Sequence, residues 1–311
     1  IGEGHLPWKP AWNSIYRAGA MTLASYRHGR ILFAGNAAHA MPIFGVRGLN
    51  SGLDDADNLA WKLAAVLQGS GHDALLDSYS RERVQAFHIN AESARRSTEF
   101  MSPPSRGFDV LREAALSLAA EHRDIAELIN PRQTAAVTYT ESPLSTPDAD
   151  AWSGGPAPGE VLPEVPMDGA SGHITEAVGP GFVLLHFGAP PAWAAIDGLR
   201  LVPVDASGRL AQVFDAADGS AYLLRPDGHV AARWKRPDEA TVHAALQRAL
   251  GHHAAPATTA PAMADSGATR DRLYTQLALG VSAAGSSRET LFLARLALLL
   301  CERLDDETAA R

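Results

Sequence analysis

The sequence contains very little cysteine: Cys301 is the only one in 311 residues. An internal disulfide and a cysteine-based metal cluster are therefore excluded, and no other metal site is expected. Cys301 stands in a leucine-rich stretch, where we expect it to be a small, buried apolar side chain.

Long basic runs and long apolar runs are also missing. The formal net charge is −8, and no group of Lys and Arg stands out that could neutralise phosphates, so no nucleic-acid partner is expected. An anionic small ligand stays open, because it needs only local donors. No apolar run is long enough to cross a membrane, and the N-terminal residues do not form a signal peptide. We therefore expect a cytoplasmic protein with no membrane partner.

The first half of the chain predicts one buried strand followed by long helices. Residues 31–35 (ILFAG) are apolar or small and suit a buried strand. The spacing of apolar residues predicts helices over 50–67, 74–100 and 108–129. In the first helix we expect Asn50 or Ser51 as the cap. Its acidic residues should complement the helix dipole early on, and its apolar residues should form one buried face. The acidic residues are Asp54, Asp55 and Asp57, and the apolar ones are Leu53, Ala56, Ala60, Leu63 and Leu67.

The second half predicts a small α/β unit between two linkers. Residues 142–160 are dense in Pro, Ser and Gly. Strands are expected at 181–188, 199–205 and 221–234, the last with a Pro-Asp-Gly hairpin turn, and a helix at 238–251. The expected units are 1–141, the linker 142–160, the α/β unit 155–251, a disordered linker 252–269, and a tail of two helices over 270–311.

A loop between the predicted strand and the first helix is the candidate site. The first N–H groups of a helix lack intrahelical partners, so Gly48, Leu49 and Asn50 could bind an electron-rich ligand. Gly45 and Gly48 would let the backbone approach a flat ligand closely. Taken alone, the pattern fits an anion or cofactor site, and it fits an ordinary strand–loop–helix crossover equally well.

The stretch GRILFAGNAAHAMPIFGVRGLNSGLDDADNLAWKLAAVLQG, followed by LLDSYSRER, resembles the second FAD-binding motif of the flavoprotein aromatic hydroxylases. The resemblance implies FAD as cofactor, NAD(P)H as co-substrate, and O2-dependent hydroxylation of a small aromatic, phenolic substrate. It places Gly35 and Asn36 at the ribityl chain, and Pro42 to Gly45 along the flavin ring. Gly48, Leu49 and Asn50 would then donate to the pyrimidine edge, where charge develops on reduction.

Two residues depart from the family pattern at this site. Asn36 stands where the family usually has Asp, so a charge-assisted bond is lost and FAD affinity could fall by about tenfold. Ile43 replaces a frequent second proline, which leaves the loop less rigid. His39 is expected to pack and hydrogen-bond rather than act as a base, and Arg47 to form a salt bridge. No catalytic residue can be assigned.

The Gly-x-Gly-x-x-Gly unit that binds the FAD pyrophosphate in this family is absent from the sequence. The expected fold class is therefore α/β: a partial, Rossmann-like FAD-binding domain without its N-terminal half, then a thioredoxin-like domain and a short helical tail. We thus expect a C-terminal fragment of a hydroxylase. The thioredoxin-like unit has GAPPAW (188–193) where a redox pair would stand, so thiol redox activity is excluded.

Two other functions stay open. The chain could be a non-catalytic FAD-binding or assembly module, or a flavoprotein of another reaction, such as an epoxidase or a reductase. A structural or dimer-forming role is open for the thioredoxin-like unit, so a homodimer is a further expectation.

Overall fold

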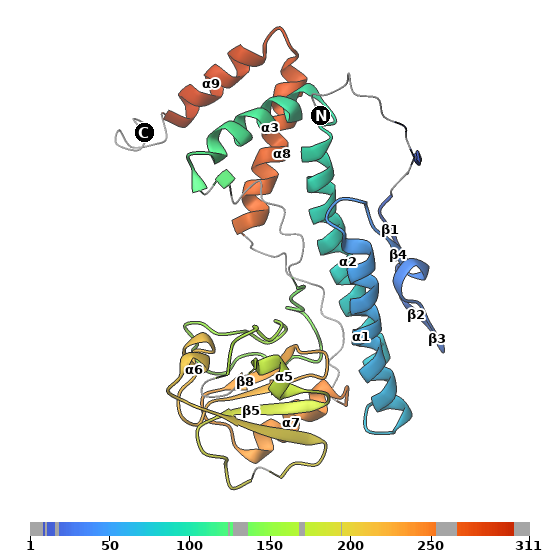
Figure 1. The fold of residues 1–311 in the computed structure, drawn as a ribbon, viewed down its shortest axis with the longest axis vertical. Helices are drawn as coiled ribbons and strands as arrows, with labels where there is room; N and C mark the ends of the chain where they lie inside the picture. The colour runs from blue at the N-terminus through green and yellow to red at the C-terminus, as the bar shows by residue number, and fades with distance from the viewer. Residues whose placement is uncertain are drawn as a thin grey trace.

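The structure is a computed structural model, and it describes residues 9, 11–15, 19–123, 125–126, 136–167, 172–193, 195–252 and 266–301. Two long helices, α1 (Arg47–Leu67) and α2 (Ala74–Met101), run side by side, with two short two-stranded sheets along one flank (Figure 1). A four-stranded sheet with its helices lies at one end of this helix pair (Figure 1). We call this part of the chain, residues 174–249, the sheet unit. Within these ranges, no helix is long and apolar enough to span a membrane.

Residues 31–35 do not form the buried strand that we predicted. β3 (Ile31–Leu32) pairs antiparallel with β2 (Arg27–His28), and Ile31 is 62% exposed. A second pair joins β1 (Met21–Thr22) to β4 (His39–Ala40). Gly29, at a φ of 62°, makes the tight turn that brings β3 back onto β2. The apolar run is therefore half of a local hairpin.

Helix α1 is present, but it begins earlier than expected and buries its other face. It begins at Arg47 after Val46, so neither Asn50 nor Ser51 caps it, and the three aspartates lie beyond its first turn. Leu53 and Leu67 are exposed. The buried residues are polar: Arg47, Ser51, Asp55, Asn58 and Lys62. Burial of this face is possible because these side chains find partners on α2 and on the sheet unit.

The prediction for α2 is confirmed, and its expected core residues Leu75, Leu76, Tyr79, Phe87 and Ala94 are buried. α3 (Arg106–Ala119) ends before the expected residue 129, and 127–135 lie outside the described residues. The two predicted tail helices are α8 (Ser266–Ala284) and α9 (Glu289–Cys301), so helix begins inside the linker expected over 252–269. The structure does not describe residues 253–265 or the side chain of Cys301, so the predictions of a disordered linker and of a buried cysteine lie outside the described residues.

The tail returns to the N-terminal half through α8, which lies against α3 (Figure 1). Ser282 Oγ accepts a hydrogen bond from the N–H of Gly107 at 3.0 Å. A Cβ at Gly107 would stand 1.9 Å from the carbonyl oxygen of Ala278. Glycine is therefore required where the two helices touch.

The predicted α/β unit is confirmed in its strands, its hairpin and its closing helix. The sheet order is β6-β5-β7-β8, with β5 and β6 parallel and the other pairs antiparallel. The hairpin turns at Pro226-Asp227-Gly228, and Asp238 caps α7 by accepting from the N–H of Thr241. The bounds are α5 (Ile174–Val178), β5 (Phe182–Phe187), β6 (Leu199–Val204), α6 (Arg209–Val213), β7 (Ala221–Leu224), β8 (Val230–Trp234) and α7 (Glu239–Ala249).

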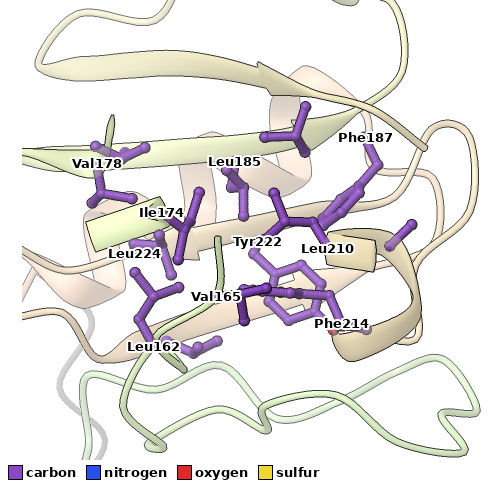
Figure 2. Packing of buried hydrophobic residues seen from close by; sticks show 14 residues of the cluster. Leu162, Val165, Ile174, Val178, Leu185, Phe187, Leu210, Phe214, Tyr222 and Leu224 are labelled. Atoms are coloured by element: carbon purple, nitrogen blue, oxygen red, sulfur yellow. Dashed lines mark hydrogen bonds between the residues drawn. The ribbon is translucent and has the colours of Figure 1, made fainter. Parts of the chain in front are cut away.

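The sheet buries both of its faces. Val183, Leu185 and Phe187 point from β5 into one core, shown in Figure 2, with α5 and α6. Phe182 and Leu184 point to the opposite core, under α7. This alternation follows from the two-residue period of a strand, and it explains why β5 reads as a continuous apolar run.

Candidate functional site

The seven residues predicted to hold a cofactor lie on η1 (Gly35–Ala37), on the loop 41–46 and on the first turn of α1. The structure brings η1 against α1: a Cβ built on Gly52 would be 3.5 Å from the Cα of Gly35. Asn36, Leu49 and Asn50 are exposed, whereas Gly35, Pro42, Gly45 and Gly48 are partly buried. The seven predicted residues therefore lie on adjoining elements, and we call them together the loop surface.

The loop before α1 uses unusual backbone conformations. Gly45 has a φ of 93°, and Val46 stands in the left-handed region at φ 51° and ψ 38°. That conformation is strained for a β-branched residue. At Gly48 the backbone is not left-handed, and the nearest atom to a built Cβ is the Cβ of Met41 at 3.8 Å. Nothing in the described protein therefore requires glycine at position 48, which leaves close approach by a ligand as a reason for it.

The N-terminus of α1 is electrostatically suited to an electron-rich group. Val46 offers no side-chain acceptor as a cap, and the first turn contains no acidic residue. Asn50 does not cap the helix either, because its Nδ2 donates to the carbonyl of Val46 at 3.0 Å. The positive end of the helix dipole is thus left without a side-chain cap, and this end faces the same surface as Gly48 and Leu49.

A buried carboxylate holds the Gly35–His39 turn in place. Asp55 Oδ2 accepts hydrogen bonds from the N–H of Gly35 at 2.8 Å and from His39 Nε2 at 2.8 Å. Asp55 is fully buried, and Asn36 lies exposed between the two anchored residues. Asp55 therefore clamps both ends of the turn that presents Asn36.

Arg83 of α2 completes this clamp. Its Nε donates to Asp55 Oδ1 at 2.6 Å, its Nη2 to the carbonyl of Ser51 at 3.1 Å, and its Nη1 to the hydroxyl of Tyr139 at 2.7 Å. Burial acts to raise the pKa of Asp55, but the His39 hydrogen bond and the Arg83 charge outweigh it and hold that pKa below its ordinary value. The carboxylate is therefore ionised at neutral pH.

His39 is buried and bonded to Asp55, which confirms the expectation of a packing and hydrogen-bonding residue. Arg47 is also buried, and it donates to Asn90 Oδ1 and Ser93 Oγ, each at 2.8 Å. Burial lowers the pKa of Arg47. The salt bridge expected of Arg47 stays a prediction.

A second buried network joins the helix pair to the sheet unit. Glu82 accepts from Lys62 Nζ at 2.6 Å and from Arg225 Nη1 at 2.7 Å, while Arg225 also pairs with Asp227. Trp61 Nε1 donates to Asp227 Oδ2 at 2.9 Å. Burial lowers the pKa of Lys62 to about 8, whereas the cations hold the pKa of Glu82 far below its ordinary value despite burial. We call these charged residues, Lys62, Glu82, Arg225 and Asp227, the interdomain cluster.

Sequence reasoning assigned Asp55 only to the helix dipole, and it missed Arg83, Tyr139 and Glu82. A usable signal was present in α1. Its polar residues recur at helical spacing, which indicates a buried polar face; they are Ser51, Asp55, Asn58 and Lys62. The partners that make such a face stable could not be read from local spacing.

Two family models match the chain. Residues 1–93 match the FAD binding domain, and residues 155–253 match the C-terminal region of aromatic-ring hydroxylases. The first match contains the whole loop surface and the Asp55 clamp, and the second contains the sheet unit. The first match indicates the class of FAD-binding proteins.

Relatives agree with this class. The chain is 31% identical to a 6-methylpretetramide 4-monooxygenase of Streptomyces rimosus, over 83% of this chain and 50% of the relative. It is 28% identical to a 3-(3-hydroxy-phenyl)propionate/3-hydroxycinnamic acid hydroxylase of Escherichia coli, over 70% of this chain and 45% of the relative. Among solved structures, the Diels-Alderase PyrE3 of pyrroindomycin biosynthesis is 33% identical with a TM-score of 0.57, over 78% of this chain and 46% of that one.

The chain thus carries two segments that match FAD binding domains and aromatic-ring hydroxylases, and it is similar to flavoprotein aromatic hydroxylases. This confirms the resemblance carried by the loop motif, and the mixed α/β class is confirmed as well. The chain spans about half the length of the curated relatives that it matches.

Proposed function

We propose that this chain supplies the flavin-ring side of an FAD-dependent monooxygenase site that hydroxylates a small aromatic, phenolic substrate with NAD(P)H and O2. One observation carries the proposal: the uncapped, glycine-bearing N-terminus of α1 lies beside the clamped Gly35–His39 turn, inside the segment that matches an FAD binding domain. Flavin, when bound, supplies the redox chemistry.

The residues present fit a flavin at this surface. The free N–H groups of Gly48 and Leu49 would stabilise the electron-rich pyrimidine edge, and Pro42 to Gly45 would line the ring. The N–H of Asn50 stands one position further along α1, where it faces the carbonyl of Val46 within the helix, so Asn50 would contribute only its exposed side chain. Gly35 and Asn36 would hold the ribityl chain, with the Asn36 amide oxygen accepting a hydroxyl bond. The protein's part is to orient the ring and to exclude water from it.

The sheet unit is proposed to be a thioredoxin-like domain without redox activity. Its order β6-β5-β7-β8, with one parallel pair and two antiparallel pairs, supports this proposal. It contains no cysteine, so it cannot exchange disulfides. We propose a structural role for it, and a homodimer and a cytoplasmic location stay predictions.

The second candidate is an FAD-binding module without monooxygenase turnover. Asn36 in place of the usual Asp and Ile43 in place of a proline favour it. A solved neighbour described as a Diels-Alderase supports it too, because a cycloaddition needs no net oxidation. Turnover of NAD(P)H with a phenol would separate the two candidates, since only the monooxygenase forms hydroxylated product.

The test uses the 311-residue chain and the variant Gly48→Ala. A methyl group at position 48 meets no close protein atom, so we expect unchanged thermal stability but FAD binding at least about tenfold weaker by flavin fluorescence titration. Gly154→Ala is the matched control, because its backbone is also not left-handed and the nearest atom to its built Cβ is likewise a side-chain carbon at 3.8 Å, Asp215 Cβ, near the sheet. Equal affinity of Gly48→Ala and wild type, or no FAD binding by wild type, would overturn the assignment of this surface.

A further inference from the structure

Two neighbouring residues of α2 connect the loop surface, where we propose that the flavin binds, to the sheet unit. Glu82 accepts from Arg225 in the hairpin β7–β8, and Arg83 donates to Asp55, which anchors Gly35. The two side chains are consecutive on one turn of α2, and each also bonds α1: Glu82 through Lys62, and Arg83 through Asp55. A shift of the sheet unit therefore reaches the same helical turn that supports the Asp55 clamp.

Tyr139 makes the more direct connection. Its hydroxyl oxygen accepts from Arg83 Nη1 at 2.7 Å, and its ring stacks on His229 at 4.5 Å between centroids with 29° between planes. Its backbone is bonded to Gly159, whose N–H in turn donates to the carbonyl of Val230 at 2.8 Å. Tyr139 is thus attached to the sheet unit by its main chain and its ring, and to Arg83 by its hydroxyl.

The path from Tyr139 to the loop is short and buried. Tyr139 and Arg83 are each 2% exposed, and Asp55 is 0% exposed. Nε, Nη1 and Nη2 of Arg83 donate to Asp55, Tyr139 and Ser51 respectively, so the planar guanidinium is held from three sides. In a close-packed interior without exposed partners, loss of one bond lets the guanidinium rotate and alters the other two.

We propose that Tyr139 is a positioning residue for the flavin surface, through which the sheet unit sets the Gly35–His39 turn by way of Arg83 and Asp55. This inference rests on the proposed function. It assigns the sheet unit a part in cofactor affinity although none of its residues lies on the loop surface.

The test compares Tyr139→Phe with Tyr222→Phe in the full 311-residue chain. Both changes remove one buried tyrosine hydroxyl, but that of Tyr222 bonds the carbonyl of Phe214 inside the sheet unit. We expect Tyr139→Phe to weaken FAD binding by about three- to tenfold and to speed amide exchange at Gly35. Tyr222→Phe should change neither, whatever it does to the melting temperature.

A double-mutant cycle adds a second readout. Arg83→Lys keeps the charge but loses the planar fork, so we expect Tyr139→Phe to have little further effect on FAD binding in that background. Additive losses would overturn the proposed path. So would equal losses in Tyr139→Phe and Tyr222→Phe, which would indicate general destabilisation.

FAD binding tests the proposed function, and amide exchange at Gly35 tests the coupling through Tyr139. If wild type does not bind FAD, the proposed function fails, and exchange at Gly35 in the FAD-free chain decides the coupling by itself. Faster exchange in Tyr139→Phe alone supports the path, and unchanged exchange overturns it.

Discussion

Neutralising Glu82 is expected to cost more stability than removing Lys62, although the two form one ion pair. Both side chains are almost fully buried, and Lys62 Nζ lies 2.6 Å from Glu82 Oε2. Glu82→Gln would leave the ammonium of Lys62 and the guanidinium of Arg225 facing Asp227 as the one remaining acidic partner in the interdomain cluster. An uncompensated buried charge costs about 3–5 kcal/mol, so we expect a loss of that size.

Lys62→Met should cost less, about 1–3 kcal/mol, because Arg225 and several neutral donors would still bond the carboxylates of the cluster. Glu82 would keep two bonds from Arg225, one from Asn58 Nδ2 at 2.8 Å and one from the hydroxyl of Ser142. Asp227 would keep its bond from Trp61. Excess negative charge would therefore meet several hydrogen-bond donors, whereas excess positive charge would keep Asp227 and the weaker contacts with the rings of Trp61 and Tyr139.

The assay is urea unfolding at pH 7, followed in parallel by far-UV circular dichroism and tryptophan fluorescence, so that a split transition would be visible. Glu113→Gln is the matched control. Its carboxylate is 66% exposed and pairs with Arg112 at the surface, where the loss should be below about 1 kcal/mol. Equal losses in Lys62→Met and Glu82→Gln, or a loss in Glu82→Gln no larger than in Glu113→Gln, would show that unpaired positive charge is not the costlier one in this cluster.

Three further predictions concern the loop and the buried carboxylates. Asn36→Asp should tighten FAD binding by about tenfold in a fluorescence titration, because the ribityl bond becomes charge-assisted; an unchanged dissociation constant would show that residue 36 does not touch the cofactor. Val46→Gly should raise the free energy of unfolding by up to about 1 kcal/mol, since it relieves a left-handed valine that is 67% exposed, and a loss in urea unfolding would contradict the strain. The free energy of unfolding should fall as the pH drops below about 4.5. The native state holds the pKa values of Asp55 and Glu82 below their ordinary values, so the unfolded chain binds protons first as the pH falls. A urea midpoint unchanged between pH 5 and pH 3 would contradict this prediction.

Elements with strong local signals were predicted well. The hairpin of β7 and β8 follows from Pro-Asp-Gly between two apolar runs, and α7 follows from Asp238 at its start and Gly251 at its end. The buried residues of α2 follow from their helical spacing. In each case the deciding interactions lie within a few residues along the chain.

The strand at 31–35 shows where local reasoning was insufficient. Its apolar composition indicated burial, but burial of a strand depends on what covers it, and composition does not supply that information. In the structure its partner is the adjacent β2, and Ile31 is exposed. Only the pairing could decide this.

The family resemblance and the position of the loop surface could be read from the amino-acid sequence alone, because the glycines, Asn36 and the start of α1 are contiguous. The tertiary structure decided which face of α1 is buried and which residues hold the loop. Asp55 meets Arg83 on another helix, and Trp61 meets Asp227 in another unit, 166 residues away. Charged side chains are buried where opposite charges or hydrogen-bonding groups meet them, and chain folding determines where those partners lie.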